Sequence, residues 1–232
     1  MILPLHDDNP TTTRPYVTVA IIVACTVVYL LMLPSAQLSR DAMYVLGVVP
    51  AVVTARVTPD YLELPVPLTI FTSMFLHGGF WHLAGNMLYL WIFGNNIEDA
   101  MGRVRYFVFY VLCGAAAVYA NVLLNPASLS PMIGASGAIS GVLGAYLLLY
   151  PRARVLLGVP IGFLVVGLGR YPAVWVLLAW FGMQVVLGAF DLTRPAGAEG
   201  GIAFGAHVGG FVAGLLLVTI FKRRDVPLWR RY

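Results

Sequence analysis

Three short stretches of this sequence place polar side chains among apolar ones in a way that suits acyl transfer. Ser136 lies in a Gly-Ala-Ser-Gly motif, His207 lies in an apolar run near the end of the chain, and His82 and Asn86 are four residues apart. A serine hydroxyl becomes a nucleophile when a nearby imidazole takes its proton, and N–H donors stabilise the oxyanion that then forms. These residue types predict a serine hydrolase, provided that the fold brings them together.

Other hydrolytic chemistries lack their residues here. A zinc protease needs His-Glu-x-x-His, but residues 82–86 read HLAGN. An α/β-hydrolase needs Gly-x-Ser-x-Gly, and Ala138 occupies the last position of that pattern. An aspartyl mechanism needs two carboxylates, whereas no Asp or Glu lies inside the long apolar runs. We therefore expect a Ser–His dyad without an acid, a metal or another cofactor, in which packing orients the base.

The composition predicts that these residues work in a membrane. The chain has 232 residues, of which 60% are hydrophobic and only 10% are charged, and its mean hydropathy is +0.85. Soluble domains carry about 25% charged residues. A net charge of +4 would suggest a nucleic-acid partner only in a soluble chain, so we expect none here. Cys25 and Cys113 lie in apolar runs, where they are expected to pack and not to form a disulfide or a metal site.

Six apolar runs are long enough to cross about 30 Å of hydrocarbon. They occupy residues 17–33, 81–97, 104–124, 135–150, 172–190 and 202–221. The fold class expected is therefore all-α, a polytopic membrane bundle of six transmembrane helices that forms one domain over residues 17–221.

The remaining segments connect or flank these helices. Residues 1–16 are expected to be a leader that is retained and not cleaved as a signal peptide, and residues 222–232 a basic tail. Residues 34–80 form a long apolar loop that packs on the bundle or dips into the lipid headgroups. Residues 151–171 contain Pro160 and several glycines, and we expect them to form a loop on or in the membrane interface.

Lys and Arg positions predict the orientation, because they concentrate on the cytoplasmic side of membrane proteins. With both termini inside, 11 of the 14 Lys and Arg residues fall in inner segments. The outer segments hold Arg40, Arg56 and Arg194. We expect a multi-pass protein of a bacterial-type cell membrane with both termini cytoplasmic. Glu98 and Asp99, just past the inner end of the second helix, are expected to be structural.

In this orientation the candidate residues lie at one depth, a little below the outer surface. Each alone has an ordinary structural role available to it, since serine in a membrane helix usually packs or bonds to its own helix. Ser136, His207 and His82 nevertheless all fall in the first third of a helix that runs inward. Glycines follow both the serine and the histidine at spacings of three or four, which lets two helices approach closely; they are Gly137, Gly141, Gly144, Gly210 and Gly214. The free N–H groups at the start of the Ser136 helix point at the same place.

At these residues the sequence resembles the rhomboid family of intramembrane serine proteases. The matching pieces are the motif from Gly134 to Gly137, Ala206-His207 with Gly210, and His77, His82 and Asn86, over about residues 68–221. The resemblance implies that Ser136 is the nucleophile and His207 the base. It further implies that His82, Asn86 and the Ser136 amide form the oxyanion hole, with Gly134 and His77 in support.

The resemblance also implies a cavity open to the extracytoplasmic side and substrates that are single-pass membrane proteins, cut in or near the membrane segment. Substrate entry would lie near the fifth helix, where Trp175, Trp180 and Phe181 either form a gate or face lipid. One departure concerns Ser140, which replaces an aromatic residue that often packs on the catalytic histidine.

We therefore expect an intramembrane serine endopeptidase with transmembrane proteins and the lipid bilayer as its partners. Two alternatives stay open. An inactive relative would bind and escort membrane proteins, although Ser136 and His207 are both present. A small proton-coupled transporter would need polar groups through the whole membrane depth, and the inner halves of these helices hold few.

Overall fold

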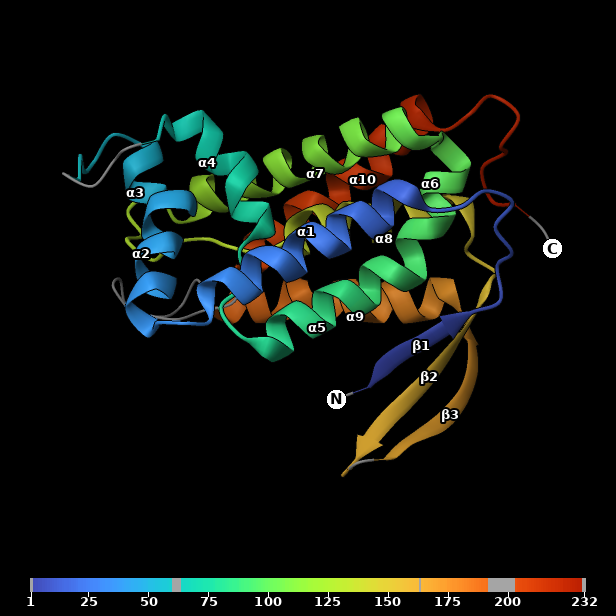
Figure 1. The fold of residues 1–232 in the computed structure, drawn as a ribbon. Helices are drawn as coiled ribbons and strands as arrows, with labels where there is room; N and C mark the ends of the chain where they lie inside the picture. Colours follow the sequence, from blue (N-terminus) through green and yellow to red (C-terminus); the bar gives the residue numbers. More distant parts are fainter. Residues whose placement is uncertain (1, 60–63, 163, 192–202, 231–232) are drawn as a thin grey trace.

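The computed structural model describes residues 2–59, 64–162, 164–191 and 203–230. Its long helices form one bundle (Figure 1). They are α1 (Tyr16–Met32), α5 (Phe80–Tyr89), α7 (Arg103–Leu124), α8 (Ser136–Leu149), α9 (Ala173–Asp191) and α10 (Phe204–Phe221). α5 continues without a break through a π-helical turn, η2 (Leu90–Gly94), into α6 (Asn95–Met101). The helical membrane bundle predicted from the sequence is confirmed, with one helical unit for each predicted span; residue 202 and Arg194 lie outside the described residues.

The length of α8 determines how deep Ser136 lies. α7, α9 and α10 are long and apolar enough to cross a membrane, whereas α1 and α8 are shorter. α8 has 14 residues and extends about 21 Å at 1.5 Å per residue, which is less than the roughly 30 Å of hydrocarbon. When Leu149 is placed at one interface, Ser136 at the other end of the helix lies about 9 Å below the opposite one.

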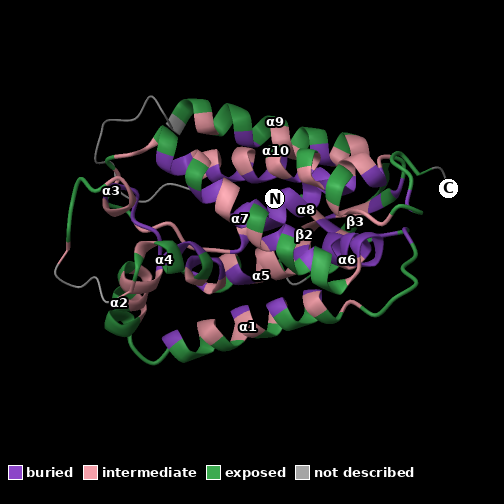
Figure 2. Cartoon of the chain, turned by 90° about the horizontal axis from the view of Figure 1, so that it is seen from above, coloured by how far each residue is buried: buried purple, intermediate pink, exposed green. Residues whose placement is uncertain are grey.

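α8 lies at the centre of the bundle and touches α10 at backbone distance. Side chains from Gly137 to Tyr146 are buried, while α1 and α9 carry many of the exposed residues (Figure 2). A Cβ atom at Gly214 of α10 would overlap the carbonyl of Gly141, and one at Gly210 would overlap the carbonyl of Gly137. The close approach expected from the glycine spacing is therefore present.

The long first loop folds into short helices that pack on the end of the bundle opposite the C-terminus, which we call the loop end (Figure 1). These are α2 (Ala36–Leu46), α3 (Pro50–Val53), α4 (Val66–Thr72) and the 3-10 helix η1 (Ser73–Phe75). Val48 exchanges two backbone hydrogen bonds with Met132, of 3.0 and 2.7 Å, and the Gly134 N–H donates to Ser73 O at 2.8 Å. Of the two placements expected for this loop, its described residues pack on the bundle and hold the chain that leads into Ser136.

Residues 151–171 differ from the irregular loop that we expected. They form an antiparallel hairpin of β2 (Arg154–Ile161) and β3 (Leu164–Pro172), and the leader adds a third strand, β1 (Leu3–Asp7), in the order β1-β2-β3. Gly162, with φ +62°, lies in the turn, which suits glycine. β1 pairs with β2 only as far as Gly158, so Pro160 lies where β2 has a single neighbour and its missing N–H is tolerated. Of the residues that suggested a loop, Gly162 therefore marks the turn of a hairpin and Pro160 lies near its tip, whereas the other glycines lie within the paired strands.

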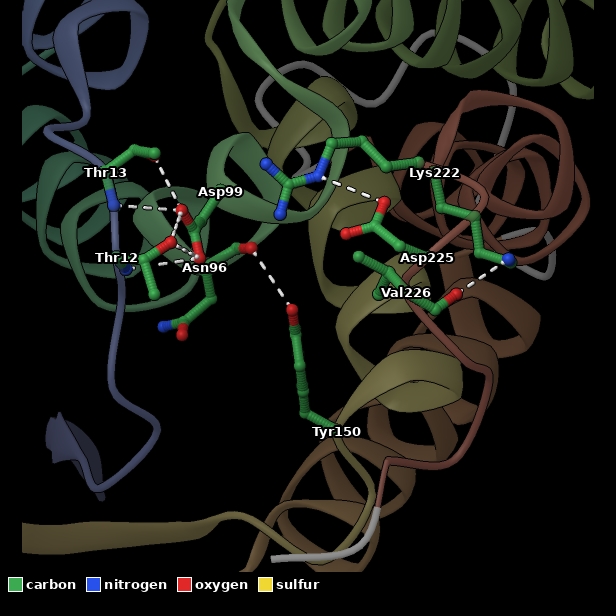
Figure 3. Close-up of polar contacts among 9 residues, drawn as sticks. Thr12, Thr13, Asn96, Asp99, Tyr150, Lys222, Asp225 and Val226 are labelled. Atoms are coloured by element: carbon green, nitrogen blue, oxygen red, sulfur yellow. Dashed lines mark hydrogen bonds and ion pairs between the residues drawn. The ribbon is translucent and has the colours of Figure 1, made fainter.

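Carboxylates of α6 hold the leader at the other end of the bundle, which we call the terminal end. Glu98 accepts hydrogen bonds from the Val17 N–H at 2.9 Å and the Thr18 N–H at 2.8 Å, and so caps α1. Asp99 accepts from the backbone and hydroxyl groups of Thr12 and Thr13 at 2.6 to 3.3 Å (Figure 3). The structural role expected for Glu98 and Asp99 is therefore present, with the leader as their partner.

Asp7 extends this attachment into the sheet. Its carboxylate accepts hydrogen bonds from Asn96 Nδ2 at 2.9 Å and from the Tyr146 hydroxyl near the end of α8. The C-terminal tail lies at the same end, where the Arg223 N–H donates to Ala100 O and the Trp229 N–H to Leu148 O. Leader and tail thus cover the terminal ends of α6 and α8.

The contact between α8 and α10 makes a first prediction. Gly214→Ala places a methyl group against the Gly141 carbonyl, so the helices must separate, and we expect a loss of stability of about 1–3 kcal/mol. Thermal unfolding in detergent measures it. Gly182→Ala in exposed α9, where no atom lies within 4 Å of the new methyl, is the matched control and should be neutral or slightly stabilising. Equal midpoint temperatures of thermal unfolding for Gly214→Ala and Gly182→Ala would contradict close packing at Gly214.

The leader attachment makes a second prediction. Burial acts to raise the pKa of Asp99, but hydrogen bonds from Thr13 and Thr12 outweigh it and lower the pKa below its ordinary value. The stabilisation is therefore present above about pH 3.9, the ordinary value, and is lost as the pH falls through the lowered pKa. We expect Asp99→Asn to weaken leader docking at pH 7 by about 1–3 kcal/mol and to reduce its acid dependence.

Hydrogen exchange of residues 3–13 measures this docking. Asp225→Asn changes an exposed carboxylate that pairs with Arg223 at the same end, and it should leave the exchange unchanged. If acid changes the hydrogen-exchange protection of the leader no more in the wild type than in Asp99→Asn, then Asp99 does not hold the leader.

Candidate active site

Ser136 and His207 meet at the loop end of the bundle. Ser136 is the first residue of α8, and His207 lies in the first turn of α10. The distance from Ser136 Oγ to His207 Nε2 is 2.8 Å, within hydrogen-bond range. Because the glycine contacts hold the two helices together just beyond this point, short side chains bridge the gap. This is the geometry that a nucleophile and its base require.

The other ring nitrogen of His207 has a partner that the sequence analysis missed. His207 Nδ1 lies 2.8 Å from Oε1 of Gln184 in α9, and Gln184 is only 5% exposed. An amide oxygen accepts hydrogen bonds, so Nδ1 carries the proton and Nε2 keeps a lone pair toward the Ser136 hydroxyl. A signal for this residue was present, because Gln184 is the one polar side chain in the apolar run 172–190.

Aromatic rings enclose His207 from two helices. The ring of Trp180 in α9 lies 6.0 Å from the imidazole, centroid to centroid, and Phe204 meets it edge-on at 6.4 Å. Trp180 and Phe204 thus supply aromatic packing on the imidazole. Ser140 does not, because its Oγ donates to the Ser136 carbonyl of its own helix at 2.7 Å. Trp175, by contrast, is 67% exposed on the outer surface of α9.

His82 and Asn86 of α5 converge on the backbone just before Ser136. Gly134 has φ +114°, and a Cβ atom there would lie 2.8 Å from His82 Nε2 and 3.6 Å from Asn86 Nδ2. Only glycine leaves room for both side chains in this conformation. The Gly78 N–H donates to His82 Nδ1 at 3.5 Å, which leaves the ring proton on Nε2, facing Gly134.

His82 Nε2 and Asn86 Nδ2 are therefore two side-chain donors near the place where an oxyanion would form. Asn86 Nδ2 is buried and has no hydrogen-bond partner among the described residues. The first N–H groups of α8 also lack intrahelical acceptors, as at every helix start. Asn86 and His82 thus lie beside the backbone that leads into Ser136.

His77 lies behind His82 and is 1% exposed. The two rings meet edge-on with centroids 5.1 Å apart, and His77 Nδ1 lies 3.3 Å from Phe75 O. Burial, and then the neighbouring His82, lower the pKa of His77 to about 4, so it is neutral at pH 7. Its contact is with His82, which fits a supporting position.

A small cavity of about 30 Å³ adjoins Ser136. A water molecule needs roughly 10–15 Å³ of such volume, so the cavity has room for about two. Small side chains make up much of its lining, which includes Ser73, Gly114, Ala117, Gly137, Ala138 and Ala206. Within the described part of the chain, no three His, Cys, Asp or Glu side chains are arranged to hold a metal ion.

Comparisons with known proteins agree on one family. A family model described as the Rhomboid domain matches residues 66–224. The chain is 35% identical over 163 residues to Rhomboid protein 1, mitochondrial, of Saccharomyces cerevisiae, a match that covers 68% of this chain and 42% of that protein. It is 30% identical over 155 residues to RHOMBOID-like protein 1 of Arabidopsis thaliana, covering 67% of this chain and 34% of the relative.

A bacterial relative matches over a shorter stretch. Rhomboid protease GluP of Bacillus subtilis is 40% identical over 78 residues, which are 34% of this chain and 15% of that protein. The chain spans less than half the length of each of these curated relatives.

Proposed function

This chain belongs to the rhomboid family, and on that premise we propose that it is a serine endopeptidase that cleaves single-pass membrane proteins in or near their membrane segment. The observation that carries the proposal is the 2.8 Å contact between Ser136 Oγ and His207 Nε2. A dyad of this kind needs no metal or cofactor. The name of one relative, Rhomboid protease GluP, describes the same class of activity.

The proposed reaction is acyl transfer in two steps. His207 Nε2 takes the Ser136 proton as Oγ attacks the carbonyl carbon of the substrate. The imidazolium then gives that proton to the leaving amine, the C–N bond breaks, and an acyl-enzyme remains. Water, activated by the same Nε2, hydrolyses the ester and restores the serine. Asn86 Nδ2, His82 Nε2 and the Ser136 N–H would donate to the oxyanion in both steps.

The recessed position of Ser136 supports a membrane-embedded substrate. A peptide bond in an intact helix has its carbonyl bonded within the helix, so the substrate must unwind locally before attack. The backbone N–H and C=O groups that unwinding exposes need hydrogen-bond partners, which lipid does not offer. The cavity beside Ser136, with its small lining residues, offers room for water and for a small substrate side chain.

The orientation and the membrane are part of the proposal. The distribution of Lys and Arg supports cytoplasmic termini and a site that opens to the extracytoplasmic side. We propose the cell membrane as the location. Fractionation of the source cells tests it against a mitochondrial membrane, the location given in the name of the Saccharomyces cerevisiae relative.

Substitution of the dyad tests the proposed function. We expect Ser136→Ala and His207→Ala to reduce cleavage of a helical membrane substrate in detergent by about 10³-fold or more. A fluorophosphonate probe should label the wild type and not Ser136→Ala. Ser130→Ala, an exposed serine of the preceding loop, should behave as the wild type.

Three other outcomes would contradict the proposed protease function. Cleavage that persists in Ser136→Ala would end the assignment. Substrate binding by a wild type that neither labels nor cleaves would favour the escort function. Proton flux in sealed vesicles that is lost in His207→Ala would favour a transporter.

The oxyanion donors make a separate prediction. Asn86→Ala removes a buried donor that faces the backbone before Ser136, so we expect kcat to fall about 10²-fold with little change in KM. Asn95→Ala, at the far end of the same continuous helix, is the matched amide control. A loss of kcat that is equal in the two variants would show a general effect of destabilising the helix and would remove Asn86 from the oxyanion hole.

A further inference from the structure

We propose that Gln184 is the positioning residue of this site: it fixes the tautomer and the orientation of the His207 imidazole, the function that a carboxylate has in a Ser–His–Asp triad. This inference rests on the proposed function and extends it to a third residue. Nothing in the dyad itself holds the ring, because a single hydrogen bond accepted at Nε2 leaves the imidazole free to tilt and to exchange its proton between nitrogens.

The geometry supports one tautomer. His207 Nε2 and Nδ1 lie 2.8 Å from Ser136 Oγ and from Gln184 Oε1, respectively. Two bonds, one at each ring nitrogen, fix the ring along the line between its partners, and Trp180 and Phe204 restrict rotation about that line. Because Oε1 only accepts hydrogen bonds, the proton stays on Nδ1 and the lone pair of Nε2 stays directed at the nucleophile.

The position of Gln184 in α9 argues that the contact is specific. Its neighbours Met183, Val185 and Val186 are 44 to 53% exposed, whereas Gln184 is 5% exposed and turned toward the bundle. A buried amide without a partner would be destabilising, and among apolar residues an aliphatic side chain would pack as well. The hydrogen bond to His207 is the feature that an aliphatic residue at this position would lack.

An amide also suits this environment better than an acid. A carboxylate in the membrane interior is costly, whereas an amide offers the acceptor oxygen without a charge. Among the described residues, the ionisable side chain that faces His207 is His82 of α5, while Asp7, Glu98 and Asp99 lie at the terminal end of the bundle with the leader. Gln184 therefore orients the base but does not neutralise the imidazolium.

Replacement by an isosteric residue tests the inference. Gln184→Met keeps the length of the side chain and removes the acceptor, and Gln184→Glu keeps an acceptor oxygen. The main readout is the rate constant for labelling of Ser136 by a small fluorophosphonate, because this probe does not need to dock as a helix. We expect Gln184→Met to slow labelling and kcat about 10- to 100-fold with KM nearly unchanged. Gln184→Glu should label at least about 10-fold faster than Gln184→Met.

Controls separate positioning from packing. Met183→Leu, on the exposed surface beside Gln184, should leave labelling and kcat unchanged. Gln184→Met that labels at the wild-type rate would overturn the inference, as would Gln184→Glu that labels as slowly as Gln184→Met.

A spectroscopic measurement keeps the inference testable if a variant fails to fold. In ¹⁵N-histidine NMR of the wild type, His207 should carry its proton on Nδ1, and a proton found on Nε2 would overturn the assignment. The signal is assigned by its absence in His207→Ala. A wild type that shows the Nδ1–H tautomer but resists the fluorophosphonate would contradict the proposed function while leaving the Gln184 contact intact.

Discussion

The candidate site depends on the backbone contact between α8 and α10. Serine has one of the shortest polar side chains, so its hydroxyl reaches an imidazole on another helix only when the helices nearly touch. Gly210 and Gly214 of α10 supply that approach, since a methyl group on either would overlap a backbone carbonyl of α8. In a membrane such contacts also contribute much of the association between helices, because lipid is as apolar as the side chains it replaces. The same glycines therefore hold the bundle together and set the 2.8 Å distance between Ser136 and His207.

Some polar side chains inside the bundle have a hydrogen-bond partner, and others have none. Ser140 bonds to its own helix, and Gln184 bonds to His207. Asn86 Nδ2 is buried without a partner among the described residues, as are the Tyr106 and Tyr110 hydroxyls of α7, but Asn86 lies against Gly134, two residues before Ser136. An unpaired buried donor costs about 1–3 kcal/mol, so its place beside Gly134 favours a functional role over a structural one. A donor left unpaired in the resting protein is what an oxyanion hole requires.

Much of this arrangement was predictable from the sequence, and the exceptions have physical reasons. The spans were predictable because about 20 apolar residues in a row are typical of a helix that crosses a membrane, and Ser136, His82 and Asn86 stood out as polar groups within such runs. Gln184 was missed although it stands out in the same way, because a single amide does not reveal which helix face it occupies. The sheet was missed because β2 and β3 are apolar with scattered glycines and Pro160, and because β1 comes from the other end of the chain. Pairing between residues so far apart leaves no local pattern.

The distribution of polar side chains along α8 bears on which function the bundle serves. Ser136 and Ser140 lie at one end of this helix, and Tyr146, which donates to Asp7, lies toward the other. Between them Val142, Leu143 and Ala145 have no exposed surface. A proton path across the membrane would need polar groups or water through this layer, and the small cavity beside Ser136 is on one side of it. The loop end of the bundle thus holds the groups that suit chemistry, and the terminal end holds those that fasten the leader. An apolar layer between two polar ends is the arrangement expected of a site served by water from one side only.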